Sequence, residues 1–221
     1  MDQQLTIDGP SLPPASGAAP KEIVLLLHGV GADGNDLIGL APYFQEILPD
    51  ALFISPNAPY RYDKAPSGYQ WFSLRDYSDG ARLEGAKAAA PILNRFIDAT
   101  LAANDLSEEN MVLIGFSQGC MMALHVGLRR KRALAGIVGY SGMLVGADVL
   151  ANEICSRPPV LMTHGDYDPV LPPQALHAAE VALNTAGISV RAVMRPGLAH
   201  GIDEICIQLG KQFLAETFGV S

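Results

Sequence analysis

Cysteine is scarce in this sequence, and long apolar runs are missing from it. The 221 residues contain three cysteines, Cys120, Cys155 and Cys206, whose odd number and wide spacing argue against a disulfide framework and against a zinc site. No run of about 18 apolar residues occurs, so the sequence predicts no transmembrane helix. The N-terminus lacks the basic region and apolar segment of a signal peptide. We therefore expect a cytoplasmic protein with reduced thiols and no bound metal.

Positive charge is also in short supply. Lys and Arg together number 15, against 23 Asp and Glu, which gives a net charge of -8. Such a surface repels phosphate backbones, so we expect no nucleic-acid partner. No basic cluster suggests docking on anionic lipid, and we expect no stable membrane insertion. Hydrophobic residues make up 49% of the chain, which is enough for a large core.

Secondary-structure signals divide the chain into a short leader and one domain. Residues 1–20 are predicted as an N-terminal leader or hairpin, because residues 9–20 are rich in turn formers, and residues 21–221 as a single domain. Short apolar runs predict strands at residues 23–27, 51–55, 111–116, 134–140, 159–163 and 189–194. Helical spacing predicts helices at residues 36–48, 83–101, 118–130, 147–154, 174–186 and 202–218. This alternation indicates an α/β fold, a mostly parallel central sheet with helices on both faces.

The run Gly115-Phe116-Ser117-Gln118-Gly119 lies between a predicted strand and a predicted helix. A nucleophile elbow with the pattern G-x-S-x-G requires this context, because the turn is sharp and a side chain at either glycine would clash. Ser117 would stand at its tip with an exposed hydroxyl and a strained backbone. The alternative is that Ser117 is only a helix N-cap.

Two later segments supply partners for such a serine, in the chain order Ser, acid, His. Asp166 and Asp168 both follow the predicted strand at residues 159–163; Pro169 fixes the turn behind Asp168 and favours it. His200 follows the last predicted strand and would act as general base. The other histidines are predicted to be structural or surface residues: His28, His125, His164 and His177.

The glycine-rich loop from His28 to Gly34 follows the first predicted strand. Its position suits the second donor of an oxyanion hole, so the N–H groups of Val30 and Gln118 are the predicted donors. A phosphate-binding loop is disfavoured, because the glycine spacing differs and no lysine follows. Residues 56–80 follow no period and are predicted to form a functional loop or lid. Apolar residues on predicted loops at this edge would line an acyl pocket: Trp71, Phe72, Met143, Leu144, Leu171 and Leu198.

Taken together, these motifs resemble the phospholipase/carboxylesterase family, which includes acyl-protein thioesterases and small bacterial carboxylesterases. The similarity rests on the loop from His28 to Gly34, the Gly-Phe-Ser117-Gln-Gly run, the stretch from His164 to Val170, and the late His200. The resemblance implies an α/β-hydrolase fold without cofactor. It places the triad at Ser117, Asp168 and His200, the oxyanion donors at Val30 and Gln118, and Trp71 at the substrate entrance.

The expected function is hydrolysis of short- to medium-chain acyl esters through an acyl-enzyme intermediate. Lysophospholipase or acyl-protein thioesterase activity is the alternative within enzymes, and a non-catalytic, ligand-binding α/β-hydrolase is the alternative of another class. The segment from Arg195 to His200 departs from the glycine–methionine context of thioesterases, which argues against protein depalmitoylation specifically. The partner would be a small acyl ester or thioester. Members of the family are often dimers, so the resemblance also implies a possible homodimer.

Overall fold

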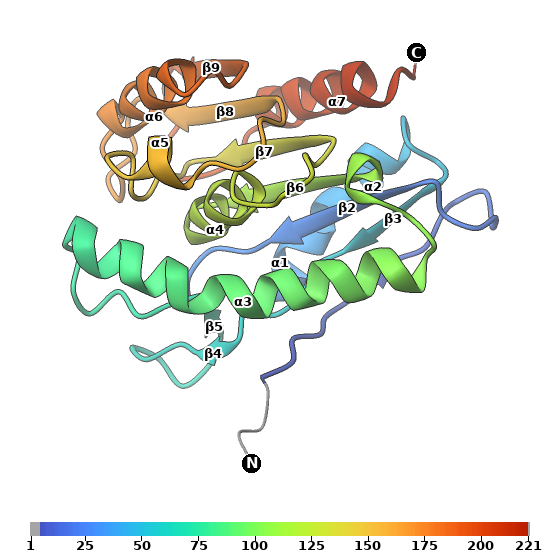
Figure 1. Ribbon diagram of the computed structural model, residues 1–221, viewed down its shortest axis with the longest axis horizontal. Helices are drawn as coiled ribbons and strands as arrows, with labels where there is room; N and C mark the ends of the chain where they lie inside the picture. The colour runs from blue at the N-terminus through green and yellow to red at the C-terminus, as the bar shows by residue number, and fades with distance from the viewer. Residues whose placement is uncertain (1–4, 221) are drawn as a thin grey trace.

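The computed structural model describes residues 5–220 and has a seven-stranded sheet at its centre (Figure 1). The strand order is β1-β3-β2-β6-β7-β8-β9. These strands are β1 (Ser11–Leu12), β2 (Glu22–Leu27), β3 (Ala51–Ile54), β6 (Met111–Phe116), β7 (Gly136–Tyr140), β8 (Val160–Gly165) and β9 (Val190–Arg195). All neighbours pair in parallel except β1, which runs antiparallel to β3. The predicted α/β-hydrolase class, a mostly parallel sheet flanked by helices, is confirmed.

Helices cover both faces of this sheet. They are α1 (Gly34–Leu37), α2 (Ala41–Gln45), α3 (Asp79–Ala103), α4 (Gln118–Gly127), α5 (Leu150–Glu153), α6 (Gln174–Thr185) and α7 (Glu204–Phe218), with 3-10 turns η1 (Ile38–Leu40) and η2 (Glu108–Asn110). On one face α3, α4 and α6 share a core with one set of strand side chains. On the other face α2 and α7 pack on the alternate set. Strands buried on both sides in this way read as continuous apolar runs, which is why they were predictable.

The prediction of one continuous helix at residues 36–48 is wrong. The structure divides the region into α1, η1 and α2. Helix α1 begins early because the Asp33 side chain caps it, accepting the N–H groups of Asn35 and Asp36. Pro42 then lies in the first turn of α2, where it has no N–H to donate to the preceding turn.

The segment at residues 56–80, predicted as a loop or lid, contains a small antiparallel hairpin. Its strands are β4 (Tyr60–Arg61) and β5 (Tyr69–Gln70). Strand β5 of this hairpin is tied to the glycine-rich loop, because Gly31 donates to the Tyr69 carbonyl and Tyr69 donates to the Ala32 carbonyl. Strands of two residues carry no period that a sequence could reveal.

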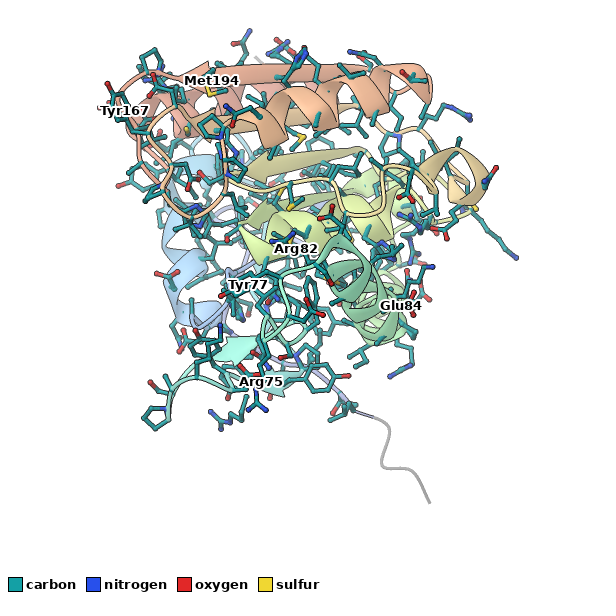
Figure 2. All side chains as sticks on the ribbon, turned by 90° about the vertical axis from the view of Figure 1, so that its left-hand side faces the viewer. Arg75, Tyr77, Arg82, Glu84, Tyr167 and Met194 are labelled. Carbon is teal, nitrogen blue, oxygen red and sulfur yellow. The ribbon has the colours of Figure 1, made fainter. Side chains whose placement is uncertain are left out.

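The carboxyl ends of the parallel strands meet at one edge of the sheet. Figure 2 faces this edge. Tyr167 follows β8 and Met194 lies near the end of β9. Both lie above Arg82, Tyr77 and Arg75 in this view. Ligands of open α/β sheets bind at this edge. Among residues 5–220, no helix has both the length and the apolar character needed to cross a membrane.

Candidate active site

Ser117 occupies a strained turn between β6 and α4. Its backbone has φ 53° and ψ -115°, a region that side chains disfavour. The two glycines of the motif allow the turn. A Cβ on Gly119 would lie 1.8 Å from the Leu27 carbonyl oxygen, and one on Gly115 would lie 2.4 Å from the Gly119 carbonyl. The glycines therefore let α4 approach β2 and β6 closely, as the sequence predicted.

His200 and Asp168 meet Ser117 at the carboxyl edge of the sheet. The His200 Nε2 atom lies 3.0 Å from Ser117 Oγ, and His200 Nδ1 lies 2.7 Å from Asp168 Oδ2. The His200 ring also packs against Phe116, with ring centroids 5.0 Å apart. The structure thus joins three residues, 83 and 32 positions apart in the chain, in one line of hydrogen bonds.

Asp168 is held in place by its own loop. Its Oδ1 atom accepts the N–H groups of Val170 and Leu171, at 2.8 and 2.9 Å. Burial by itself raises the pKa of Asp168, but the hydrogen bonds from His200, Leu171 and Val170 outweigh it and hold that pKa below its usual range. The carboxylate is therefore ionised at neutral pH and able to accept the His200 Nδ1–H.

Asp166, the competing acid, has a different role. It is exposed, and its Oδ1 accepts the Gly197 N–H at 2.7 Å. This bond ties the loop after β8 to the loop that carries His200. Gly165 lets the two loops approach, since a Cβ there would lie 2.1 Å from the Leu198 carbonyl oxygen.

An ion pair closes the base of the His200 loop. Arg195 contacts Asp203 at 2.9 Å, and Asp203 also caps α7 by accepting the Cys206 N–H. Burial alone raises the pKa of Asp203, but the Arg195 guanidinium and the Cys206 N–H outweigh it and lower that pKa to about 2. The pair therefore persists in mild acid.

We expect Asp203→Asn to remove about 1–2 kcal/mol of stability near neutral pH. A carboxyl whose pKa is lowered on folding stabilises the fold above its unfolded pKa of about 3.9, and this contribution is lost as pH falls through about 2. Urea denaturation of both proteins should therefore show a gap that is constant above about pH 5 and shrinks between about pH 4 and pH 2. A gap independent of pH would contradict the prediction.

Two backbone N–H groups near Ser117 are free to bind an anion. Within residues 5–220, the N–H groups of Val30 and Gln118 donate to no protein acceptor. Gln118 is the first residue of α4, so the positive end of the helix dipole adds to its donor. Gly29 brings the loop against the serine, since a Cβ there would lie 3.3 Å from Ser117 Cβ. The predicted oxyanion donors thus both lie in the immediate surroundings of Ser117.

The side chain of Gln118 explains why glutamine follows the serine, which the sequence alone left unexplained. It is fully buried, accepts the Trp71 N–H at 2.8 Å and donates to the Phe72 carbonyl at 2.7 Å. The Trp71 indole N–H donates to the His28 carbonyl, and His28 Nε2 accepts the Ala58 N–H. These bonds fasten residues 58–72 to the glycine-rich loop and to α4.

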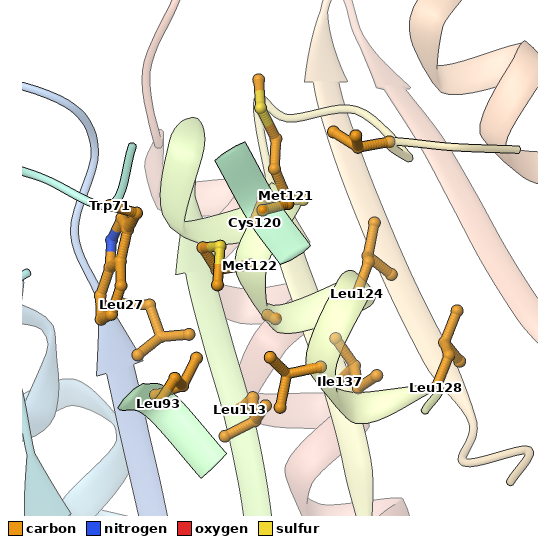
Figure 3. Close-up of a cluster of buried hydrophobic side chains, with 14 of the residues drawn as sticks. Leu27, Trp71, Leu93, Leu113, Cys120, Met121, Met122, Leu124, Leu128 and Ile137 are labelled. Atoms are coloured by element: carbon orange, nitrogen blue, oxygen red, sulfur yellow. The ribbon is translucent and has the colours of Figure 1, made fainter. Parts of the chain in front are cut away.

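Trp71, expected at the substrate entrance, is fully buried (Figure 3). Figure 3 shows it among Leu27, Met122 and Cys120 in the core. Phe72 is buried as well, at 3% exposure. Gln118 holds the backbone of both residues, and a role in substrate binding stays a prediction for them.

Met143 and Leu144, by contrast, line a cavity of about 420 Å³. Its other walls come from the start of α3, the turn before α5, and α6: Asp79, Gly80, Arg82, Leu83, Val145, Gly146, Ala147, Asp148 and Ala178. Ser117, Asp168 and His200 are not among the lining residues. The cavity is connected to the serine through Gly142, the residue before Met143, since a Cβ there would lie 3.0 Å from the Ser117 carbonyl oxygen. Leu171 is buried behind Asp168, and Leu198 packs on the opposite face of the sheet. The structure therefore does not gather the six predicted pocket residues in one place.

Ser141 is a residue of this region that sequence reasoning missed. It follows β7, is fully buried, and has φ 46°. Its Oγ donates to the Gly201 carbonyl at 2.9 Å, next to His200. The available signal was a polar residue directly after the predicted strand at residues 134–140. Among residues 5–220, no group of His, Cys, Asp and Glu has an arrangement suited to a metal ion.

Known proteins resemble this chain over nearly its whole length. The sequence profile of the Phospholipase/Carboxylesterase family matches residues 14–218. Acyl-protein thioesterase 1 of Schizosaccharomyces pombe is 30% identical over 206 residues, which cover 89% of this chain and 91% of the relative. Esterase YpfH of Escherichia coli is 27% identical over 198 residues, covering 89% and 83%. Among solved structures, esterase PE8 superposes with a TM-score of 0.92 at 41% identity, covering 96% of this chain and 99% of that one.

Proposed function

The chain belongs to the phospholipase/carboxylesterase family of serine hydrolases, and we propose that it hydrolyses short- to medium-chain acyl esters with Ser117 as nucleophile. The observation that carries the proposal is the line of hydrogen bonds from Asp168 through His200 to Ser117, beside two free N–H groups. A nucleophile within reach of a base, with that base oriented by an acid, is the arrangement that activates a serine hydroxyl.

The geometry supports a two-step reaction. His200 Nε2 takes the Ser117 hydroxyl proton as Oγ attacks the ester carbonyl carbon, and the carbonyl oxygen becomes an oxyanion bound by the N–H groups of Val30 and Gln118. Asp168 stabilises the imidazolium through Nδ1–H. His200 then returns the proton to the departing alkoxide, which leaves as the alcohol. In the second step a water molecule repeats the attack on the acyl-enzyme and releases the acid.

A fluorophosphonate probe tests this proposal directly, because it phosphonylates an activated serine. Intact-mass analysis should show one adduct on the wild type and none on Ser117→Ala. Ser156→Ala is the matched control, since Ser156 is also buried but donates to the Gly127 carbonyl far from His200; it should be labelled like the wild type. If Ser117→Ala were labelled as strongly as the wild type, the assignment of Ser117 as the nucleophile would be contradicted. An unlabelled wild type would favour the non-catalytic ligand-binding alternative.

We propose that the acyl chain enters the cavity lined by Met143 and Leu144, because these residues directly follow Gly142, which lies against the Ser117 backbone. Its volume of about 420 Å³ lies at the small end of the range of ligand pockets. Much of its wall is aliphatic, which suits an uncharged chain of limited length. Parallel rates on p-nitrophenyl esters of graded chain length should therefore peak at short to medium chains.

Ala178 lies at the α6 wall of the cavity, and we expect Ala178→Phe to shift the substrate preference toward shorter acyl chains. Loss of room for two methylenes costs about 1.6 kcal/mol, which corresponds to a decrease of roughly 15-fold in kcat/KM for hexanoate relative to acetate. Val181→Phe places the same ring one turn later on α6, at an exposed position that does not line the cavity, and should leave the ratio unchanged. Equal ratios in the two variants would contradict the assignment of the cavity.

Thioesters are the second candidate class of substrate. The Schizosaccharomyces pombe relative is named an acyl-protein thioesterase and aligns over 89% of this chain. The same serine chemistry cleaves both bonds, so the leaving group decides between them. Rates on acyl-CoA and lysophospholipid, measured beside p-nitrophenyl esters of the same acyl chain, would separate the three activities.

A further inference from the structure

His164 is a buried titratable residue to which the proposed mechanism gives no part. It lies in β8, four residues before Asp168, and its side chain has no exposed surface. Its Nε2 atom lies 3.1 Å from the Leu171 carbonyl oxygen and 3.2 Å from Asp168 Oδ2. That carboxylate oxygen is the one that lies 2.7 Å from His200 Nδ1. Two imidazoles therefore meet at a single oxygen of the predicted triad acid.

The surroundings of His164 determine which ring nitrogen carries the proton. Both atoms close to Nε2 are oxygens that only accept hydrogen bonds, so Nε2 must present a hydrogen to them. The Nδ1 atom is buried and has no partner within residues 5–220, so nothing there favours a proton on Nδ1. On α6, which packs against β8, His177 and Glu180 lie 3.6 Å from each other at the surface. Asp168 is thus the charged side chain that His164 contacts.

We propose that His164 is a positioning residue of the triad, whose Nε2–H is shared between the Leu171 carbonyl and Asp168 Oδ2. A shared N–H at these distances fixes the plane of the carboxylate, which Val170 and Leu171 hold only from the Oδ1 side. It also takes up part of the negative charge on Oδ2, so that Oδ2 binds the His200 imidazolium less tightly. This inference rests on the proposed Ser117 chemistry.

The experiment compares two amides at position 164. Glutamine can place its amide nitrogen where Nε2 lies, whereas the shorter asparagine reaches only the position of Nδ1. In His164→Asn we expect plateau kcat on p-nitrophenyl butyrate to fall about tenfold with KM nearly unchanged, because the carboxylate is less well aligned. The acid limb of the pH profile of kcat/KM should move to higher pH by about half a unit. Without the His164 N–H, Oδ2 keeps more negative charge and binds the His200 imidazolium more tightly. His164→Gln should keep both values close to those of the wild type.

A structural role alone would lower stability without moving the acid limb. His125→Asn is the matched control, since His125 is also buried and has an unpartnered Nδ1 but lies in α4, away from Asp168. It should lower the melting temperature and leave the limb in place. A limb that stays still in His164→Asn, or moves to lower pH, would overturn the proposal.

A measurement on the wild type keeps the proposal testable even where a variant fails to fold. The ¹⁵N chemical shifts of the His164 ring should show Nε2 protonated and Nδ1 bare, and a ring protonated at Nδ1 would overturn the proposal. Failure here is distinguishable from failure of the proposed function. An inactive, unlabelled wild type removes the function, whereas an active wild type with the wrong tautomer or an unmoved acid limb removes only the role of His164.

Discussion

Replacing Asp168 with asparagine should lower kcat on p-nitrophenyl esters about 10⁴-fold. An amide nitrogen cannot accept the Nδ1–H of His200, so the imidazole would turn to the tautomer that has no free electron pair on Nε2. The fold should survive, because the Asn oxygen can still accept the N–H groups of Val170 and Leu171. Steady-state kinetics with a melting curve for each protein checks both halves of the prediction.

Asp166→Asn is the matched control, two residues away in the same loop. Asp166 is exposed, and an Asn oxygen could replace the acceptor that now receives the Gly197 N–H. Surface changes of this kind usually cost within about 0.5 kcal/mol, so we expect activity within about twofold of the wild type. A large loss in Asp166→Asn with a small one in Asp168→Asn would reverse the assignment of the acid.

Replacing Gly119 with alanine should destabilise the protein by at least about 3 kcal/mol. The added Cβ would lie 1.8 Å from the Leu27 carbonyl oxygen and 2.8 Å from the His28 carbonyl oxygen. Both are backbone atoms, one of them in β2, so no side-chain rotation can relieve the contact and α4 must move. For a chain of this size we expect the melting temperature to fall by roughly 6–12 °C. The folded fraction of the variant should have a kcat about 10²-fold lower, because the Gln118 N–H moves with α4 out of its place beside Ser117.

Gly80→Ala offers the matched control for this change. Gly80 is the second residue of α3, as Gly119 is of α4, and a Cβ there would meet nothing within 4 Å. Alanine favours helix over glycine by about 1 kcal/mol, so this variant should melt at the wild-type temperature or slightly above it. If both variants melted alike, close helix–strand packing would not be the reason for the glycine in the motif.

Local chemistry made most of the fold predictable. Strands β2, β6 and β8 are buried on both faces and therefore appear as unbroken apolar runs. The steric demand for Gly115 and Gly119 follows from the elbow itself. The helix expected at residues 36–48 was misjudged because apolar spacing continued across Pro42, where the chain divides into short helices. The hairpin of β4 and β5 was invisible, because its pairing is non-local and each strand has two residues.

The candidate site was predictable where residue type and place in the fold coincide. Ser117, Asp168 and His200 each follow a strand, so the parallel sheet alone brings them to one edge. Residues that act through contacts were not predictable. The sequence suggested that Trp71 lines an entrance, but the bonds it makes to Gln118 and His28 bury it. Ser141 was missed because its partner, the Gly201 carbonyl, lies 60 residues away.

The sequence by itself determined the order of the parallel strands and of the longer helices, the strand–turn–helix context of Ser117, and the order in which candidate acid and histidine follow it. These properties depend on residue type and spacing, which act within a few residues along the chain. Only the tertiary structure decided which groups touch: the line from Asp168 to Ser117, the clamp of Gln118 on residues 71–72, and the approach of His164 to the carboxylate. Hydrogen bonds act within about 3 Å, and only the folded chain brings atoms from separate strands and loops that close.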